Sequence, residues 1–154
     1  MDKNILIEYA DMKEEIKDLR QRIEQNKKEL SRLNGQVVMD SVSCGKKGKK
    51  PLGTVKITGR PVTAISRKES LLNKRIRRLE ELEEELLELT IQVDEYIETI
   101  EKSELRIIFR LYYIDDLTWY QVALRMNQNF PKRKVKYTED NCRMRHNRFL
   151  EKLE

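Results

Sequence analysis

Between residues 2 and 33 the apolar residues recur alternately every three and every four positions, which is the heptad spacing of a coiled-coil helix. The positions between them carry mainly charged residues, so this segment is predicted to be an amphipathic helix with one apolar stripe. Asn26 is the one polar residue in the stripe. It either fixes the register against a partner helix or is simply tolerated near the end of the helix. Asn34 and Gly35 predict where the helix stops. The stripe comprises Ile5, Tyr9, Met12, Ile16, Leu19, Ile23, Asn26, Leu30 and Leu33.

A second apolar stripe predicts another long helix, over residues 66–101. Between the helices, the 36–62 segment holds two short β-branched stretches around a lysine-rich sequence, CGKKGKKPLG, which predicts a small β-hairpin or a loop. A connector of this length lets the helices form an antiparallel hairpin within one chain, and it equally permits pairing between copies. The second stripe comprises Leu72, Ile76, Leu79, Leu82, Leu86, Leu89, Val93, Tyr96 or Ile97, and Ile100.

Three shorter helices are predicted in the last third of the chain. Ser103 and Glu104 open the first, which ends at Asp115 and Asp116, while Thr118 and Thr138 are N-cap candidates for the other two. The first would bury Leu105, Ile108, Phe109 and Tyr112, with Tyr113 as a further candidate, and the second Val122, Ala123 and Met126. In the last helix Cys142, Phe149, Leu150 and Leu153 share one face with His146 between them.

The opposite face of the last helix gathers the residue types that contact phosphates and the edges of bases. A basic connector, residues 127–137, precedes this helix. Its four cations favour a wing against the sugar-phosphate backbone over the alternative, a solvated loop. The tip of the 36–62 insert is either a second phosphate contact or a solvated loop. The candidate DNA contacts are Asn141, Arg143, Arg145, Asn147 and Arg148 on the helix, Lys132, Arg133, Lys134 and Lys136 in the connector, and Lys46, Lys47, Lys49 and Lys50 at the tip.

Composition narrows the class of protein. Of the 154 residues 38% are charged, which favours long solvated helices over a thick core, and the net charge of +5 is unevenly placed. Residues 36–69 and 103–154 are basic, whereas 70–102 is acidic. No apolar run is long enough to span a membrane, and the first residues lack the order of a secretory signal, so a cytoplasmic protein is expected.

The residues that usually carry catalysis or bind metals are sparse. The two cysteines, Cys44 and Cys142, are far apart, and His146 is the one histidine, which favours packing over metal binding. No nucleotide-binding or metalloprotease motif occurs. The sequence therefore predicts a protein that is not an enzyme and has no metal or cofactor.

The order of an apolar helix, LTWYQVALRM, a connector and T-x-x-x-C-R-x-x-x-x-R-F-L-x-K-L over residues 103–154 resembles region four of bacterial sigma factors. Cys142 and Arg143 stand where that family has a valine-arginine pair, and residues 149–153 match its ending. The connector is longer than the family's turn, so packing must set the angle between its helices. The whole chain also resembles small phage and prophage proteins of low-GC Gram-positive bacteria, grouped with late-gene transcriptional activators.

The resemblance implies an all-α protein with two parts: a helical arm over residues 1–102 and a helix-turn-helix module over 103–154. It implies a phage transcriptional regulator that binds double-stranded DNA in the host cytoplasm, with the helix at 138–153 in the major groove. Host RNA polymerase and a second copy, held through the arm, are the other expected partners. Two alternatives stay open: a recognition subunit for DNA packaging, like a small terminase, and a coiled-coil adaptor that binds proteins.

Overall fold

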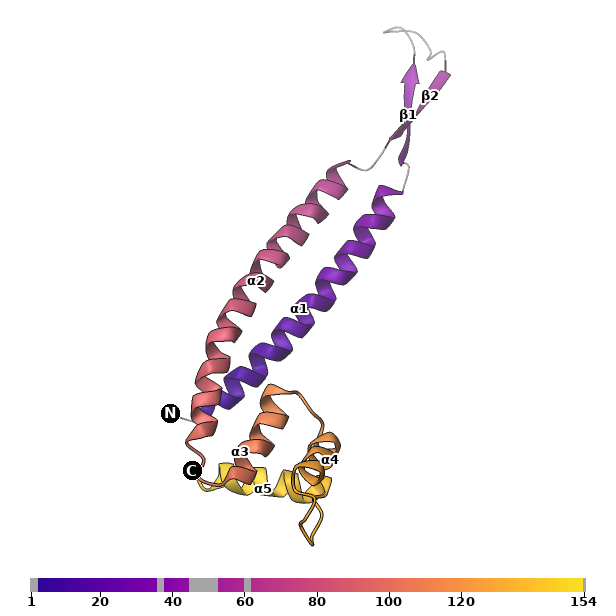
Figure 1. The fold of residues 1–154 in the computed structure, drawn as a ribbon. Helices are drawn as coiled ribbons and strands as arrows, with labels where there is room; N and C mark the ends of the chain where they lie inside the picture. The colour runs from indigo at the N-terminus through magenta and orange to yellow at the C-terminus, as the bar shows by residue number, and fades with distance from the viewer. Residues whose placement is uncertain (1–2, 36–37, 45–52, 60–61, 154) are drawn as a thin grey trace. The chain divides into compact units, whose positions relative to one another are not determined.

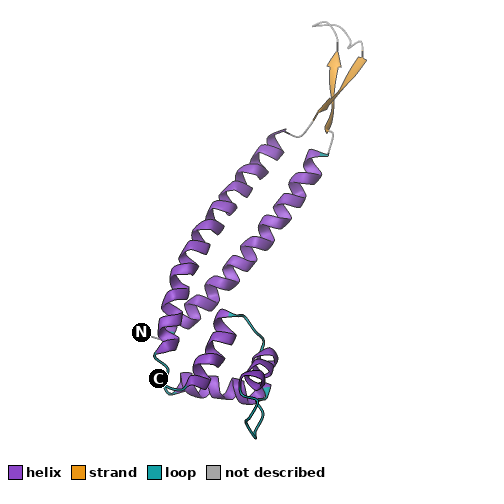
Figure 2. Ribbon diagram, in the orientation of Figure 1, coloured by secondary structure: helices purple, strands orange, loops and turns teal. Residues whose placement is uncertain are grey.

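A computed structural model describes residues 3–35, 38–44, 53–59 and 62–153 of the chain. Helices dominate it, as predicted, and one pair of strands is the only sheet in the described residues (Figure 2). The chain divides into two compact units, Ile16–Glu81 and the combination of Met1–Glu15 with Leu82–Glu154. The elements are α1 (Asn4–Asn34), β1 (Val38–Cys44), β2 (Gly53–Gly59), α2 (Val62–Glu98), α3 (Ser103–Phe109), the π-helix η1 (Arg110–Ile114), α4 (Trp119–Asn129) and α5 (Glu139–Glu151) (Figure 1).

In the Ile16–Glu81 unit, α1 and α2 lie side by side and run in opposite directions (Figure 1). Nζ of Lys68 donates to a carboxylate oxygen of Glu29 at 2.5 Å, and Nη1 of Arg75 donates to Oδ1 of Asn26 at 2.7 Å. Of the α1 stripe residues in this unit, Ile16, Ile23, Asn26 and Leu30 are buried, and Leu19 and Leu33 are partly buried. The amide nitrogen of Asn26 is buried without a partner.

The two strands of this unit pair antiparallel, with a register that runs from Val38 opposite Gly59 to Cys44 opposite Gly53. They occupy the segment predicted to be a β-hairpin or a loop. The four tip lysines, Lys46, Lys47, Lys49 and Lys50, lie outside the described residues.

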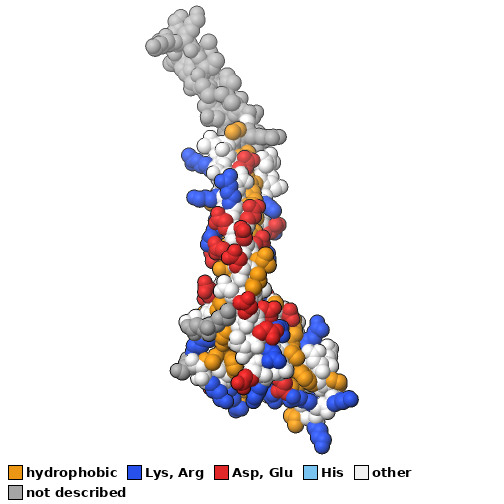
Figure 3. All heavy atoms as spheres, turned by 60° about the vertical axis from the view of Figure 1, so that its left-hand side comes forward, with side chains coloured by type: hydrophobic (Ala, Val, Ile, Leu, Met, Phe, Trp, Pro, Cys, Tyr) orange, Lys and Arg blue, Asp and Glu red, His pale blue; other side chains and the backbone are white. Residues whose placement is uncertain are grey.

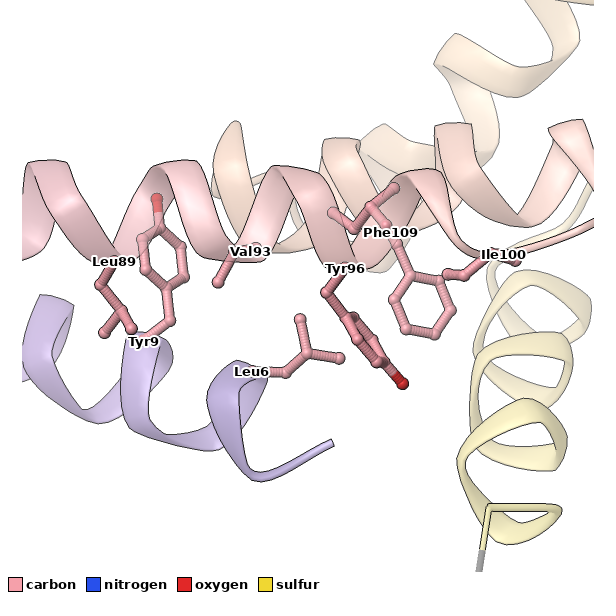
Figure 4. Packing of buried hydrophobic residues seen from close by; sticks show 8 residues of the cluster. Leu6, Tyr9, Leu89, Val93, Tyr96, Ile100 and Phe109 are labelled. Atoms are coloured by element: carbon pink, nitrogen blue, oxygen red, sulfur yellow. The ribbon is translucent and has the colours of Figure 1, made fainter. Parts of the chain in front are cut away.

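In the second unit, one hydrophobic cluster joins the beginning of α1, the end of α2 and α3 (Figure 4). The later part of the predicted second stripe is buried, at Leu82, Leu89, Val93 and Ile100, whereas Leu72, Ile76, Leu79 and Leu86 are only partly buried. The alternative at Tyr96 or Ile97 is resolved because both side chains are buried. Leu6 is fully buried although it lies outside the predicted heptad positions. The cluster consists of Leu6, Tyr9, Leu89, Val93, Tyr96, Ile97, Ile100 and Phe109.

A second cluster in the same unit joins α3, η1, α4 and α5. Thr118 caps α4 as predicted: its hydroxyl accepts from the Gln121 amide, and the Gln121 side chain accepts from the Thr118 amide. The Thr138 hydroxyl likewise accepts from the Asn141 amide at the start of α5. The cluster consists of Ile108, Leu111, Val122, Ala123, Met126, Tyr137 and Cys142.

Two predicted boundaries were wrong. The helix expected over 66–101 spans Val62–Glu98, and the hydroxyl of Thr99 donates to the carbonyl of Tyr96 at 2.6 Å, an interaction that competes with further helix. Leu153 was expected on the buried face of the last helix. Because α5 ends at Glu151, the helical spacing no longer holds there and Leu153 is 49% exposed.

Lys13 of α1 holds the end of η1 in place. Its ammonium group donates to the carbonyls of Tyr113 (2.7 Å) and Ile114 (3.2 Å), which a helix end leaves without partners, and pairs with Asp116 at 2.9 Å. Asp116 has a positive φ of 54°, where the chain turns out of η1 toward α4. The chain reversal before α4 is therefore fixed by a residue about a hundred positions away.

Candidate nucleic-acid interface

The inner side of α5 is anchored by Cys142 and His146, both of which are buried. The imidazole of His146 lies among the rings of Phe109, Tyr112 and Trp119, with centroid distances of 4.9, 5.4 and 5.1 Å. Burial lowers the pKa of this imidazole below its ordinary value, although a hydrogen bond to Asn147 partly opposes the shift. The predicted packing role of His146 agrees with this environment.

Two hydrogen bonds fix the neutral tautomer of His146. Its Nδ1 lies 2.9 Å from Oδ1 of Asn147, an acceptor, so Nδ1 carries the proton and donates it. The hydroxyl of Tyr113 then donates to Nε2 at 2.9 Å. Burial raises the pKa of Tyr113 to about 12, which keeps this hydroxyl protonated. The orientation of α5 about its own axis is thus set by polar as well as apolar contacts.

The connector between α4 and α5 is held by Asn127. Its side-chain amide donates to the Tyr137 carbonyl at 2.9 Å, and its Oδ1 accepts from the Tyr137 backbone amide at 2.8 Å. Helix α4 continues to Asn129, so the connector is shorter than the predicted 127–137. A connector of this length does not by itself set the angle between α4 and α5. These two bonds and the buried Tyr137 ring hold its end in place instead.

The Glu104 carboxylate of α3 gathers three donors. It accepts from the Tyr137 hydroxyl at 2.9 Å and from Nη1 of Arg145 at 2.6 Å, and it forms an ion pair with Arg133. The guanidinium group of Arg145 also lies over the Tyr137 ring, 5.3 Å from its centroid. These contacts join α3, the connector and α5. The Glu104 side chain is only 17% exposed, so water competes little for them.

The candidate DNA contacts consequently divide into two groups. Arg145 and Arg133 were expected on phosphates, but the structure engages both with Glu104. Asn141 is also used internally: its side-chain amide donates to the Lys136 carbonyl at 3.3 Å, and its Oδ1 is buried without a partner. The predicted outward face of α5 therefore loses Arg145 and Asn141, because sequence spacing does not show what lies beside a helix.

Three of the candidate DNA contacts on α5 remain exposed: Arg143, Asn147 and Arg148. Arg143 is 52% exposed and pairs with Asp140 on its own helix at 3.0 Å. Asn147, one turn further on, is exposed, and its Oδ1 accepts from His146 while its side-chain nitrogen has no partner within the described residues. Arg148 lines a cavity of about 510 Å³. We call this cavity the basic pocket. It has an apolar floor that includes Ile100, Leu105 and Phe149, and a rim that includes Lys102, Arg148 and Lys152.

The connector adds exposed positive charge beside α5. Lys132 and Lys134 are exposed, and Lys136 donates to the Pro131 carbonyl at 3.3 Å. In Figure 3, lysine and arginine side chains gather along the lower edge of the unit that contains α5. The connector therefore adds exposed cations next to the start of α5.

Sequence reasoning missed the residues that build the site from within: Glu104, Asn127 and Lys13. An acidic residue in the first turn of a helix ordinarily indicates helix-dipole stabilisation, so Glu104 gave no signal of an ion-pair cluster. Tyr137 and Phe130 offered one clue, since aromatic residues in a basic connector favour buried anchors. Lys13 gave none, because lysine between stripe positions is typical of a solvated helix face.

Other kinds of site find no support within the described residues. No three metal-ligating side chains come together there. The described helices also include none with the length and apolar character needed to cross a membrane. Comparison with known protein families, with curated proteins and with solved structures finds no match to this chain.

Proposed function

We propose that this chain is a sequence-specific DNA-binding protein that regulates transcription, with α4, the connector and α5 acting as a helix-turn-helix module. The observation that carries the proposal is the division of α5 into a side locked onto α3 and α4 and an exposed edge with Arg143 and Asn147. Those two residues are four positions apart, so one turn of helix separates them on the same edge.

The dimensions and chemistry of α5 suit the major groove of duplex DNA. Its 13 residues form a rod about 20 Å long, and the groove is about 12 Å wide, enough for one helix. Arginine reads guanine through O6 and N7, and asparagine reads adenine through N6 and N7. Glu139 and Asp140, exposed at the first turn, repel phosphates, which favours discrimination between sequences over indiscriminate binding.

The connector supplies the contacts that carry no sequence information. Lys132, Lys134 and Lys136 follow one another at alternate positions and lie next to the start of α5. Lysines in such a loop neutralise backbone phosphates and release their counterions. The helices α1 and α2 offer further surface for contact with a second copy or with host RNA polymerase.

Binding of the full chain to duplexes selected from a random pool tests the proposal. Replacing Arg143 with Ala should cost about 1–3 kcal/mol of binding free energy and relax the preference for bases at one position. Replacing Lys134 with Ala should weaken binding to all sequences and reduce the slope of log affinity against log salt by about one.

Arg77→Ala is the matched control, because Arg77 is an exposed arginine of α2 outside the module. Its binding should equal that of the wild type. Binding that ignores salt, or no binding to duplex DNA at all, would contradict the proposal. A ring of eight or more copies in solution would instead favour a role in DNA packaging.

A further inference from the structure

The basic pocket combines positive charge with an apolar floor, and contact with phosphates does not require such a floor. Its floor is apolar, with Ile100 buried and Phe149 partly buried, while Lys102, Arg148 and Lys152 surround it. Glu101 is the one carboxylate among the lining residues. A pocket of about 510 Å³ with an apolar floor and a cationic rim fits a ligand that is both apolar and acidic.

The exposed side of α2 also has an apolar centre, but the charged residues around it are acidic. Leu87 is 66% exposed and Ile91 is 58% exposed, although both are large aliphatic residues. Glu84 and Glu88 are exposed beside them, and the spacing of 84, 87, 88 and 91 places all four on one face of the helix. We call these four residues the acidic face.

We propose that the acidic face of one copy of this chain docks into the basic pocket of a second copy. Leu87 and Ile91 would cover the apolar floor, while Glu84 and Glu88 would meet the cationic rim. Complementary charge around an apolar centre is the usual anatomy of a specific protein interface. Removing two large aliphatic side chains from water supplies the driving force.

Both surfaces belong to the same compact unit, Met1–Glu15 with Leu82–Glu154. Each copy therefore presents one pocket and one face, and a two-fold dimer exchanges both contacts at once. The heptad stripe of α1 is a poor candidate for this purpose, because most of its positions, including Tyr9, Ile16 and Ile23, are buried within the chain. The proposed dimer thus leaves the paired helices of each copy intact.

Charge reversal on each surface tests the contact, with the mass of the full chain followed against concentration by analytical ultracentrifugation without DNA. The double variant Lys102→Glu with Lys152→Glu makes the pocket rim acidic, and Glu84→Lys with Glu88→Lys makes the face basic. Each should weaken the dimer at least about tenfold. An equimolar mixture of the two double variants should regain the dimer, because each altered pocket then meets a complementary face.

Lys132→Glu with Lys134→Glu is the matched control, since it reverses two exposed lysines outside the pocket and should leave the dimer unchanged. Circular dichroism checks folding, and the milder Lys102→Gln with Lys152→Gln replaces any variant that unfolds. A wild-type chain that stays monomeric at high micromolar concentration overturns the proposal. So does a dimer that both reversals leave intact, or a mixture that does not associate. DNA binding by the module could persist in each of these cases.

Discussion

The two compact units are stabilised in different ways. In Ile16–Glu81, α1 and α2 meet along regularly spaced stripe residues, and side-chain contacts such as Arg75 with Asn26 join positions directly across the pair. In the second unit, short helices depend on side chains far apart in the sequence, such as Tyr113 with His146 and Tyr137 with Glu104. A helix pair can lose its contacts turn by turn, whereas a cluster that joins four segments is lost as a whole.

The largest expected effect is at Phe109, whose ring is fully buried and contacts the rings of Tyr113, His146 and Phe149. Phe109→Ala should lower the free energy of unfolding by about 3–5 kcal/mol, since a cavity between several segments cannot collapse. Chemical denaturation of the full chain measures the loss.

The contrasting substitution is Ile23→Ala in the other unit. Ile23 is buried between two helices that can shift toward each other, so its loss should lie at the lower end of the usual range, about 2 kcal/mol. Equal losses for the two substitutions would remove the distinction between the units.

The next effect concerns the Glu104 carboxylate. Glu104→Ala leaves the Tyr137 hydroxyl and the Arg145 guanidinium without their acceptor, and it should lower the free energy of unfolding by about 2–3 kcal/mol. Thermal and chemical unfolding measure this loss. Asp140→Ala is the control, because the pair of Asp140 with Arg143 is exposed and should contribute less than about 0.5 kcal/mol.

A smaller effect is expected at Asn127, which brackets the backbone of Tyr137 with two hydrogen bonds. Asn127→Ala should cost about 1–2 kcal/mol, since the Tyr137 amide and carbonyl lose their partner. The exposed neighbour Gln128 provides the control, and Gln128→Ala should be neutral. If Asn127→Ala and Gln128→Ala lower the free energy of unfolding equally, the side-chain bonds of Asn127 do not hold the connector, and the packing of the Phe130 and Tyr137 rings does.

These contrasts explain which features could be predicted from the sequence. The long helices and the buried stripe follow from spacing alone, because an amphipathic helix shows its buried side as a period in the sequence. Thr118 and Thr138 were found as caps for a similar reason, since capping acts within three residues. Asn26 shows the limit: spacing located it, but its bond to Arg75 required the partner helix.

The candidate interface was only partly predictable, because residue type does not reveal what lies beside an exposed helix face. Arg143 and Arg145 are two positions apart on one helix and have the same chemistry. One pairs within its own helix at the surface, and the other pairs with Glu104, 41 positions away in the sequence. Such long-range ion pairs carry no periodic signal, so only the fold separates an arginine that pairs within its own helix at the surface from one that joins distant segments.

The smallest predicted effect is a pH dependence that belongs to the second unit through His146. Because burial lowers the pKa of its imidazole, the unfolded chain binds a proton more readily than the folded one, and stability falls as pH drops below about 6.5. Protonation would also turn Nε2 from an acceptor into a donor facing the Tyr113 hydroxyl. The free energy of unfolding, measured by denaturant titration between about pH 7.5 and pH 5.5, should decrease toward the acidic end. The shifts resolved for Glu29 and Cys142 concern ionisations below and above this window.

His146→Phe is the control for this pH dependence. The variant keeps an aromatic ring in place but has no proton to bind, so its stability should change less over the same interval. An equal slope in the variant would assign the acid sensitivity to other groups.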